Sequence, residues 1–194
     1  WNTPQPVTIT GVNDNLVDGT ITSTVTVAVN DGSSDNNFDP VADQTVSVST
    51  TDNDTAGFTI TETGGSTAVA ETGTTDTFAV VLTAQPSSDV VLSITSGDTG
   101  EAVVNGSTGS NNILTFTSGN WNTPQSFTVT GVDDNLVDGT ITSTLTVAVV
   151  DALSEDSFDA VADQTVSATT TDNDTAGFTI TETGGSTAVA ETGT

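Results

Sequence analysis

The chain has 194 residues, of which 26 are Asp or Glu and none is Lys, Arg or His, so its formal charge is −26. Nucleic acids and anionic membrane surfaces are bound through Lys and Arg, so both are excluded as partners. Cysteine is absent, which excludes disulfides and zinc–thiolate sites, whereas 33% apolar residues are too many for a solvated acidic tail. No apolar run approaches the roughly 20 residues that cross a bilayer, so membrane insertion is not expected.

The sequence repeats itself with a period of about 120 residues. The motif WNTPQ at Trp1 returns at Trp121, the string that begins TDNDTAGFTI at Thr51 returns unchanged at Thr171, and roughly four fifths of the overlapping positions are identical. A period of this length is one whole domain. We therefore predict the back half of one repeat over residues 1–54, a complete repeat over 55–174 and the start of a third over 175–194.

Within the complete repeat, apolar residues alternate with Thr and Ser, a pattern typical of half-buried strands. In chain order the predicted strands are GFTIT from Gly57 with TAVAE from Thr67 as a split first strand, then FAVVLT from Phe78, VVLSIT from Val90, ILTFT from Ile113, SFTVTGV from Ser126, ITSTLTVAVV from Ile141 and QTVSAT from Gln164. About seven strands in some 120 residues favour an all-β, immunoglobulin-like β-sandwich.

The inward positions of these strands give a predicted core. It consists of Phe78, Val80, Leu82, Leu92, Ile94, Leu114, Phe116, Phe127, Val129, Leu145, Val147 and Val166. Trp121 is expected in a turn that packs over the edge of the sandwich. Catalysis is the least expected function, because a chain without His, Cys, Lys, Arg or Tyr offers only carboxylates and hydroxyls.

Acidic clusters recur where the predicted strands end, in AETG from Ala70, GVDDNLVDG from Gly131 and TDND from Thr171. Loops at one end of a sandwich converge, so separated clusters can share a site. Asp and Asn also populate turns without any ligand, and that alternative stays open. With no basic residue to offset the carboxylates, however, a cation is favoured, and Ca²⁺ suits an all-oxygen site of flexible geometry.

Taken together, GVDDNLVDGTITSTLTV, TDNDTAGFTI and AETGTTDTFAVVLT resemble a Calx-beta domain. The resemblance implies calcium among the loops at one end of an immunoglobulin-like sandwich. Carried over by motif, the implied ligands are Glu71, Asp133, Asp134, Asp138, Asp172 and Asp174. Asp98 in SGDTGE is a looser match, and Glu101 fits about as well.

The upstream copy carries the corresponding candidates Asp14, Asp18, Asp52 and Asp54. It has Asn13 where the complete repeat has Asp133, so its junction is expected to release an ion first.

Tandem repeats of this kind resemble parts of bacterial adhesins, biofilm proteins and extracellular fibres. We therefore predict a structural module of an extracellular or cell-surface filament, stalk or adhesin, stiffened by calcium at its junctions, with neighbouring copies of the same repeat as partners. Because the sequence begins and ends within a repeat, we expect it to be one window on a longer fibre. The alternative is a carbohydrate- or surface-ligand-binding module that uses Thr-rich sheet faces, which could also carry glycans.

Overall fold

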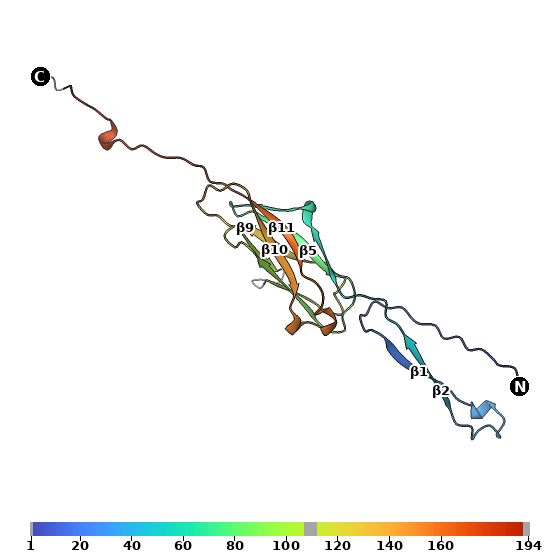
Figure 1. Ribbon diagram of the computed structural model, residues 1–194. Helices are drawn as coiled ribbons and strands as arrows, with labels where there is room; N and C mark the ends of the chain where they lie inside the picture. The colour runs from blue at the N-terminus through green and yellow to red at the C-terminus, as the bar shows by residue number, and fades with distance from the viewer. Residues whose placement is uncertain (1, 107–111, 192–194) are drawn as a thin grey trace.

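The structure is a computed structural model that describes residues 2–106 and 112–191. Trp1, which opens the first WNTPQ motif, and residues 192–194 of the predicted third segment lie outside the described residues. Figure 1 shows an elongated arrangement, with a β-sandwich in the middle, a hairpin on the N-terminal side and an extended tail on the C-terminal side. The described helices are short 3₁₀ turns, and none of them is long and apolar enough to span a membrane.

Within the described part of residues 55–174, two sheets pack into a sandwich, which confirms the predicted all-β fold. One sheet has the strand order β4-β11-β10-β6-β8 and the other has the order β3-β5-β9-β7. The only parallel pair among these described strands is β4 with β11. The strands are β3 (Phe58–Glu62), β4 (Thr67–Ala70), β5 (Thr75–Leu82), β6 (Val90–Ser96), β7 (Ala102–Gly106), β8 (Ile113–Phe116), β9 (Gln125–Gly131), β10 (Ile141–Val149) and β11 (Gln164–Thr171).

Every residue of the predicted core is buried between the two sheets. Phe78 and Phe127, paired across β5 and β9, have ring centroids 5.6 Å apart and tilted by 46°. Trp121 lies in a turn and packs against this core, and its carbonyl accepts a hydrogen bond from the Leu82 N–H at 3.2 Å. The period-two pattern therefore identified the buried faces correctly.

Two features of the sandwich were not predicted. The short run from Ala102 forms strand β7, which extends the second sheet by pairing with β9. Phe158, in the 3₁₀ turn η4 (Asp156–Phe158) between β10 and β11, is fully buried. Neither the run from Ala102 nor the segment around Phe158 has an alternating apolar pattern long enough to signal a strand.

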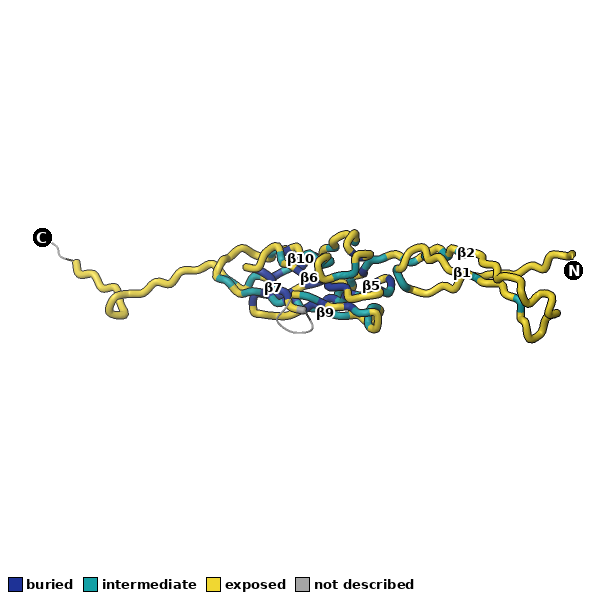
Figure 2. Tube along the Cα trace, turned by 90° about the horizontal axis from the view of Figure 1, so that it is seen from below, coloured by how far each residue is buried: buried dark blue, intermediate teal, exposed yellow. Residues whose placement is uncertain are grey.

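The partial repeats have the same sequence pattern but expose what the complete repeat buries (Figure 2). In the upstream half, β1 (Ile21–Val27) and β2 (Gln44–Thr50) form a hairpin with the register of β10 and β11. Phe38, the counterpart of buried Phe158, is 59% exposed. Phe178, the counterpart of Phe58 in the tail, is 89% exposed, whereas Phe58 is 3% exposed.

Glu155 fastens the loop between β5 and β6. Its carboxylate accepts hydrogen bonds from the N–H groups of Ser87 and Ser88 and from the Ser157 hydroxyl. Partial burial raises the pKa of Glu155, but these donors outweigh it and the net direction is down. The ionised side chain therefore stabilises the folded state above the pKa of the unfolded chain, and this stabilisation is lost as the pH falls through the lower folded pKa.

The Glu155→Gln variant is thus expected to lower the free energy of unfolding by about 0.5–1 kcal/mol near neutral pH, a modest value because solvent screens the site. The difference from the parent chain should shrink as the pH falls through the lowered folded pKa of Glu155 and vanish once that carboxyl is protonated in both states. The matched control is Asp35→Asn in the upstream half, because among the described residues the Asp35 carboxylate accepts only from the backbone and side-chain amides of Asn37, close by in sequence. Urea unfolding at several pH values measures both variants, and a pH-independent difference for Glu155→Gln contradicts this role.

Candidate metal centre

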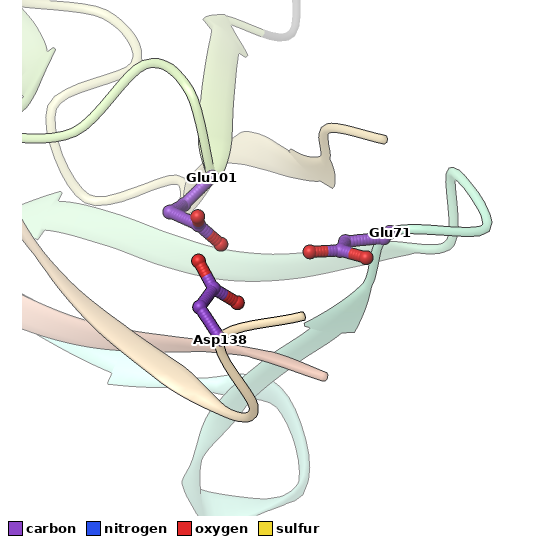
Figure 3. A group of neighbouring side chains, drawn as sticks. All are labelled: Glu71, Glu101 and Asp138. Carbon is purple, nitrogen blue, oxygen red and sulfur yellow. The ribbon is translucent and has the colours of Figure 1, made fainter. Parts of the chain in front are cut away.

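Three carboxylates from separate loops converge at the end of the sandwich from which the tail leaves. Glu71 directly follows β4, Glu101 directly precedes β7, and Asp138 lies in the loop before β10. Figure 3 shows Glu101 and Asp138 facing each other, with Glu71 directed toward them. One carboxylate oxygen from each residue lies within 4.8 Å of the others. Glu71 and Glu101 are buried, whereas Asp138 is exposed.

A second group shares Glu71 and adds Asp172 and Asp174, again with oxygens within 4.8 Å of one another. The parallel pairing of β4 with β11 creates this group, because Ala70 is in register with Thr171 and both strands end there. The Glu71 N–H continues the ladder to the Thr171 carbonyl at 3.1 Å. Residues that follow the two strands therefore leave the sheet side by side.

Backbone hydrogen bonds fix the acidic segments to one another. The Asp172 carboxylate accepts from the Gly139 N–H at 2.8 Å and from the Asp174 N–H at 2.6 Å, which ties the loop before β10 to the run after β11. The Asn173 N–H donates to Glu71 at 3.0 Å, and the Asn173 amide donates to Asp133 at 2.7 Å. These contacts hold the carboxylates close together without neutralising them.

The pKa values of the carboxylates in this cluster are shifted in opposite directions. Hydrogen bonds from the N–H groups of Asp174 and Gly139 lower the pKa of Asp172. Burial, with the nearby charges of Asp138 and Asp134, raises the pKa of Glu101. For Glu71 the Asn173 N–H lowers the pKa, but burial and the charge of Asp172 outweigh it, so the net direction is up.

Several buried oxygens in this cluster accept no hydrogen bond from the described residues. They are Oε1 of Glu71, Oε2 of Glu101 and Oδ2 of Asp174. A buried carboxylate oxygen without a donor destabilises the folded state, because the charge has lost its hydration. The sequence contains no Lys, Arg or His that could compensate. Protonation or a bound cation can relieve this cost, and of the two only a cation leaves the groups ionised.

The geometry suits calcium. Ca²⁺ binds oxygen ligands at 2.3–2.6 Å, so two oxygens on one ion lie at most about 5.2 Å apart. The separations within both groups fall inside this limit. Because Glu71 belongs to both groups, its two oxygens could serve two ions, with backbone carbonyls and water completing the six to eight ligands that calcium takes.

The predicted ligands of the complete repeat do not all lie in these two groups. Glu71, Asp138, Asp172 and Asp174 do, whereas Asp133 and Asp134 lie beside them, Asp133 bonded to Asn173 and Asp134 to the Leu136 N–H. Asp98 is exposed, accepts from the Gly100 N–H and belongs to neither group. Glu101 belongs to the first group. Glu101 directly precedes β7, so a prediction of that strand would have placed Glu101 at a strand end, beside the other acidic loops. This signal was missed because β7 was not predicted from the sequence.

The upstream loops have similar backbone hydrogen bonds to an aspartate, but their carboxylates do not converge in the same way. Asp52 accepts from the N–H groups of Asp18, Gly19 and Asp54, much as Asp172 accepts from those of Gly139 and Asp174. Asp14 accepts from the Leu16 N–H. Among the described residues, none of Asp14, Asp18, Asp52 and Asp54 belongs to a group of three converging carboxylates. The upstream half has no counterparts of Glu71 and Glu101 in this chain.

The sequence matches no protein-family model and no curated protein. Solved structures show a distant likeness. Domains 4 and 5 of the S-layer protein SbsC match with 20% identity and a TM-score of 0.42, covering 77% of this chain and 57% of theirs. The apo-form Calx CBD1 domain matches with 15% identity and a TM-score of 0.41, covering 60% and 98%. SSP-19 of Caenorhabditis elegans, an MSP-domain-like protein, matches with 16% identity and a TM-score of 0.35, covering 55% and 92%.

These identities and scores carry no statement about what this chain binds or assembles with. The chain spans just over half of the length of the first of these structures. The resemblance to Calx-beta domains therefore stays a prediction from the sequence motifs.

Proposed function

We propose that the chain is a Calx-beta-like structural module of an extracellular or cell-surface fibre, stalk or adhesin, built from 120-residue repeats with boundaries at 54/55 and 174/175. Calcium binds at the end of each sandwich and stiffens the junction with the next repeat. The proposed ligands in the complete repeat are Glu71, Glu101, Asp138, Asp172 and Asp174, with Asp133 and Asp134 in support.

One observation carries this proposal: buried Glu71 has an unpartnered oxygen and belongs to both groups of converging carboxylates, in a chain without a single basic side chain. Turn chemistry explains exposed Asp residues, but it does not explain two buried glutamates brought together from different loops. The position of the cluster supports a role at the junction. Asp172 and Asp174 lie directly between β11 and the tail, so an ion bound to them restrains the exit of the chain.

Calcium titration of the 194-residue chain tests the proposal. At a free concentration of 100 times the Kd, ligand binding to the folded state alone adds about 2.7 kcal/mol to its stability. We expect calorimetric binding, and a melting temperature that rises with calcium and falls on chelation. Magnesium should stabilise less, because it demands octahedral geometry and retains its water. Identical melting curves with calcium and with chelator, together with no binding heat, would refute the calcium site.

A further inference from the structure

The acidic loop of the upstream half docks onto the complete repeat. The Val17 N–H donates to the Gln85 carbonyl at 3.1 Å, and the Gln85 N–H donates to the Asn15 carbonyl at 2.7 Å. Leu16 and Gln85 thus form a short parallel β-bridge, and Val17 packs against the core of the complete repeat. Figure 1 shows the hairpin beside the sandwich, in line with its long direction.

The receiving segment on the complete repeat is itself well anchored. Ala84 is 1% exposed, and the Gln85 side chain donates to the Ser118 carbonyl at 2.9 Å. The connecting chain is held at the same place, because the Thr83 N–H donates to the Gly57 carbonyl and the Thr83 hydroxyl to the Thr55 carbonyl. The two units are therefore joined by a built contact as well as by the covalent connection.

The complete repeat presents the same loop to solvent. Asn135, Leu136 and Val137 repeat the sequence of Asn15, Leu16 and Val17. Leu136 is 62% exposed and Val137 is 57% exposed, whereas Leu16 and Val17 are half-buried. The tail from Thr175 repeats residues 55–74, the part of the repeat that precedes Ala84 and Gln85. The loop thus lacks, within this chain, the segment on which its upstream copy docks.

We infer that Leu136 and Val137 are the docking surface for a further repeat of the same sequence, which bridges to them through its own copy of Gln85. The inference goes beyond the calcium site, because the docking contacts use backbone amides and apolar side chains and no carboxylate. The loop has two roles in this arrangement. Its Asp138 carboxylate belongs to the acidic centre, and its Leu-Val edge receives the next repeat. Uncharged contacts also suit a joint between two acidic domains, which repel each other.

Hydrogen exchange tests the joint in two steps. In the 194-residue chain, Val17→Asp is expected to speed exchange of the Gln85 amide by about tenfold or more, since a charge on the core-facing position opens the bridge. Val137→Asp is the matched control and should leave the Gln85 amide unchanged. An unchanged Gln85 amide in Val17→Asp would show that the contact does not hold the two units together, and would overturn the inference.

The second step supplies the proposed partner. A copy of residues 75–174 is appended after Thr194, so that the repeat that begins at Thr175 is completed, and only residues 1–194 are isotopically labelled. Exchange of the Val137 amide should slow about tenfold relative to the 194-residue chain and approach the rate at Val17. Equal rates at Val137 in both chains would overturn the inference.

Two controls separate this outcome from other events. Protection of Val137 that grows with the concentration of the 194-residue chain would mean that a separate chain occupies the surface, and would also overturn the inference. The measurement is made with calcium and with chelator, and the protection is expected in both. A failed calcium site would leave melting unaffected by chelation without removing this protection, so the two failures are distinguishable.

Discussion

The Glu71→Gln variant is expected to bind calcium at least about tenfold more weakly and to lose most of the calcium-dependent rise in melting temperature, because Glu71 contributes oxygens to both carboxylate groups. Without calcium, the effect of the substitution on the melting temperature should have the opposite sign. The substitution removes one of several clustered negative charges, and it places an amide donor where Oε1 has no partner among the described residues. The calcium-free variant should therefore melt above the calcium-free parent chain.

Glu191 provides the matched control for Glu71. It occupies the same position in the repeat, but it lies exposed in the extended tail. Glu191→Gln is expected to leave both calcium affinity and melting temperature unchanged. Calorimetric titration and thermal melting of both variants, with calcium and with chelator, measure the difference. Equal behaviour of Glu71→Gln and Glu191→Gln would contradict a cation at Glu71.

The stability of the calcium-free chain, measured as a function of pH, should also show that ionised Glu71 and Glu101 destabilise the folded state. The pKa values of Glu71 and Glu101 are raised in the folded state, so the folded chain retains protons that the unfolded chain releases. Their contribution to stability is therefore present below the unfolded pKa and is lost as the pH rises through the higher folded values. Asp172 has the opposite sign, because its folded pKa is lowered.

The sequence was sufficient to predict the sandwich and its core because burial in a strand follows a period of two. Phe78, Val80 and Leu82 show this directly, since all three point inward from β5 and are buried. Phe158 and strand β7 were missed for the same physical reason. Phe158 is buried from a 3₁₀ turn, and β7 has too few alternating residues to give a periodic signal.

The partial repeats show that a local sequence pattern alone does not produce a strand. The string GFTIT forms β3 from Phe58 but contains no strand from Phe178, although the two sequences are identical. β3 is a strand because β5 pairs with it, and the tail pairs with no strand among the described residues. The turns η2 (Thr63–Gly65) and η5 (Thr183–Gly185) form in both copies, because Gly64 and Gly184 adopt positive φ without any partner. Local turns are thus encoded locally, whereas strands require a partner.

Some residues of the candidate site could likewise be predicted from local sequence, whereas others depend on long-range contacts. Asp172 and Asp174 were predictable because they follow a recognisable strand, and the repeat at Asp52 and Asp54 marks them twice. Glu101 was ranked level with Asp98 because sequence spacing in SGDTGE does not determine which carboxylate points inward. Its orientation is set by its own carbonyl, which accepts from the Val132 N–H and the Thr170 hydroxyl. Such long-range contacts are not visible in a single sequence.

Gly131, at the end of β9, links the core to the acidic centre. Its backbone lies against Ala70, the residue before Glu71, and a Cβ at position 131 would collide with the Ala70 carbonyl oxygen and lie 2.7 Å from its carbon. The Gly131 N–H donates to the Thr74 carbonyl at 3.1 Å, so the loop that carries Glu71 crosses directly over this glycine. Both obstructing atoms belong to the backbone, which cannot rotate away as a side chain can.

The Gly131→Ala variant is therefore expected to lower the free energy of unfolding by about 3 kcal/mol and the melting temperature by roughly 10 °C, because the strand and the loop must separate. Glu71 moves with that loop, so calcium affinity should fall as well, although no ligand is altered. Gly11 is the matched control, since its Cβ would meet only the Thr50 methyl group at 3.4 Å, an ordinary contact. Gly11→Ala should therefore melt and bind calcium like the parent chain. Urea unfolding and calcium titration of the two variants check this, and a Gly131→Ala chain as stable as Gly11→Ala would mean that β9 and the Glu71 loop do not approach as closely as described.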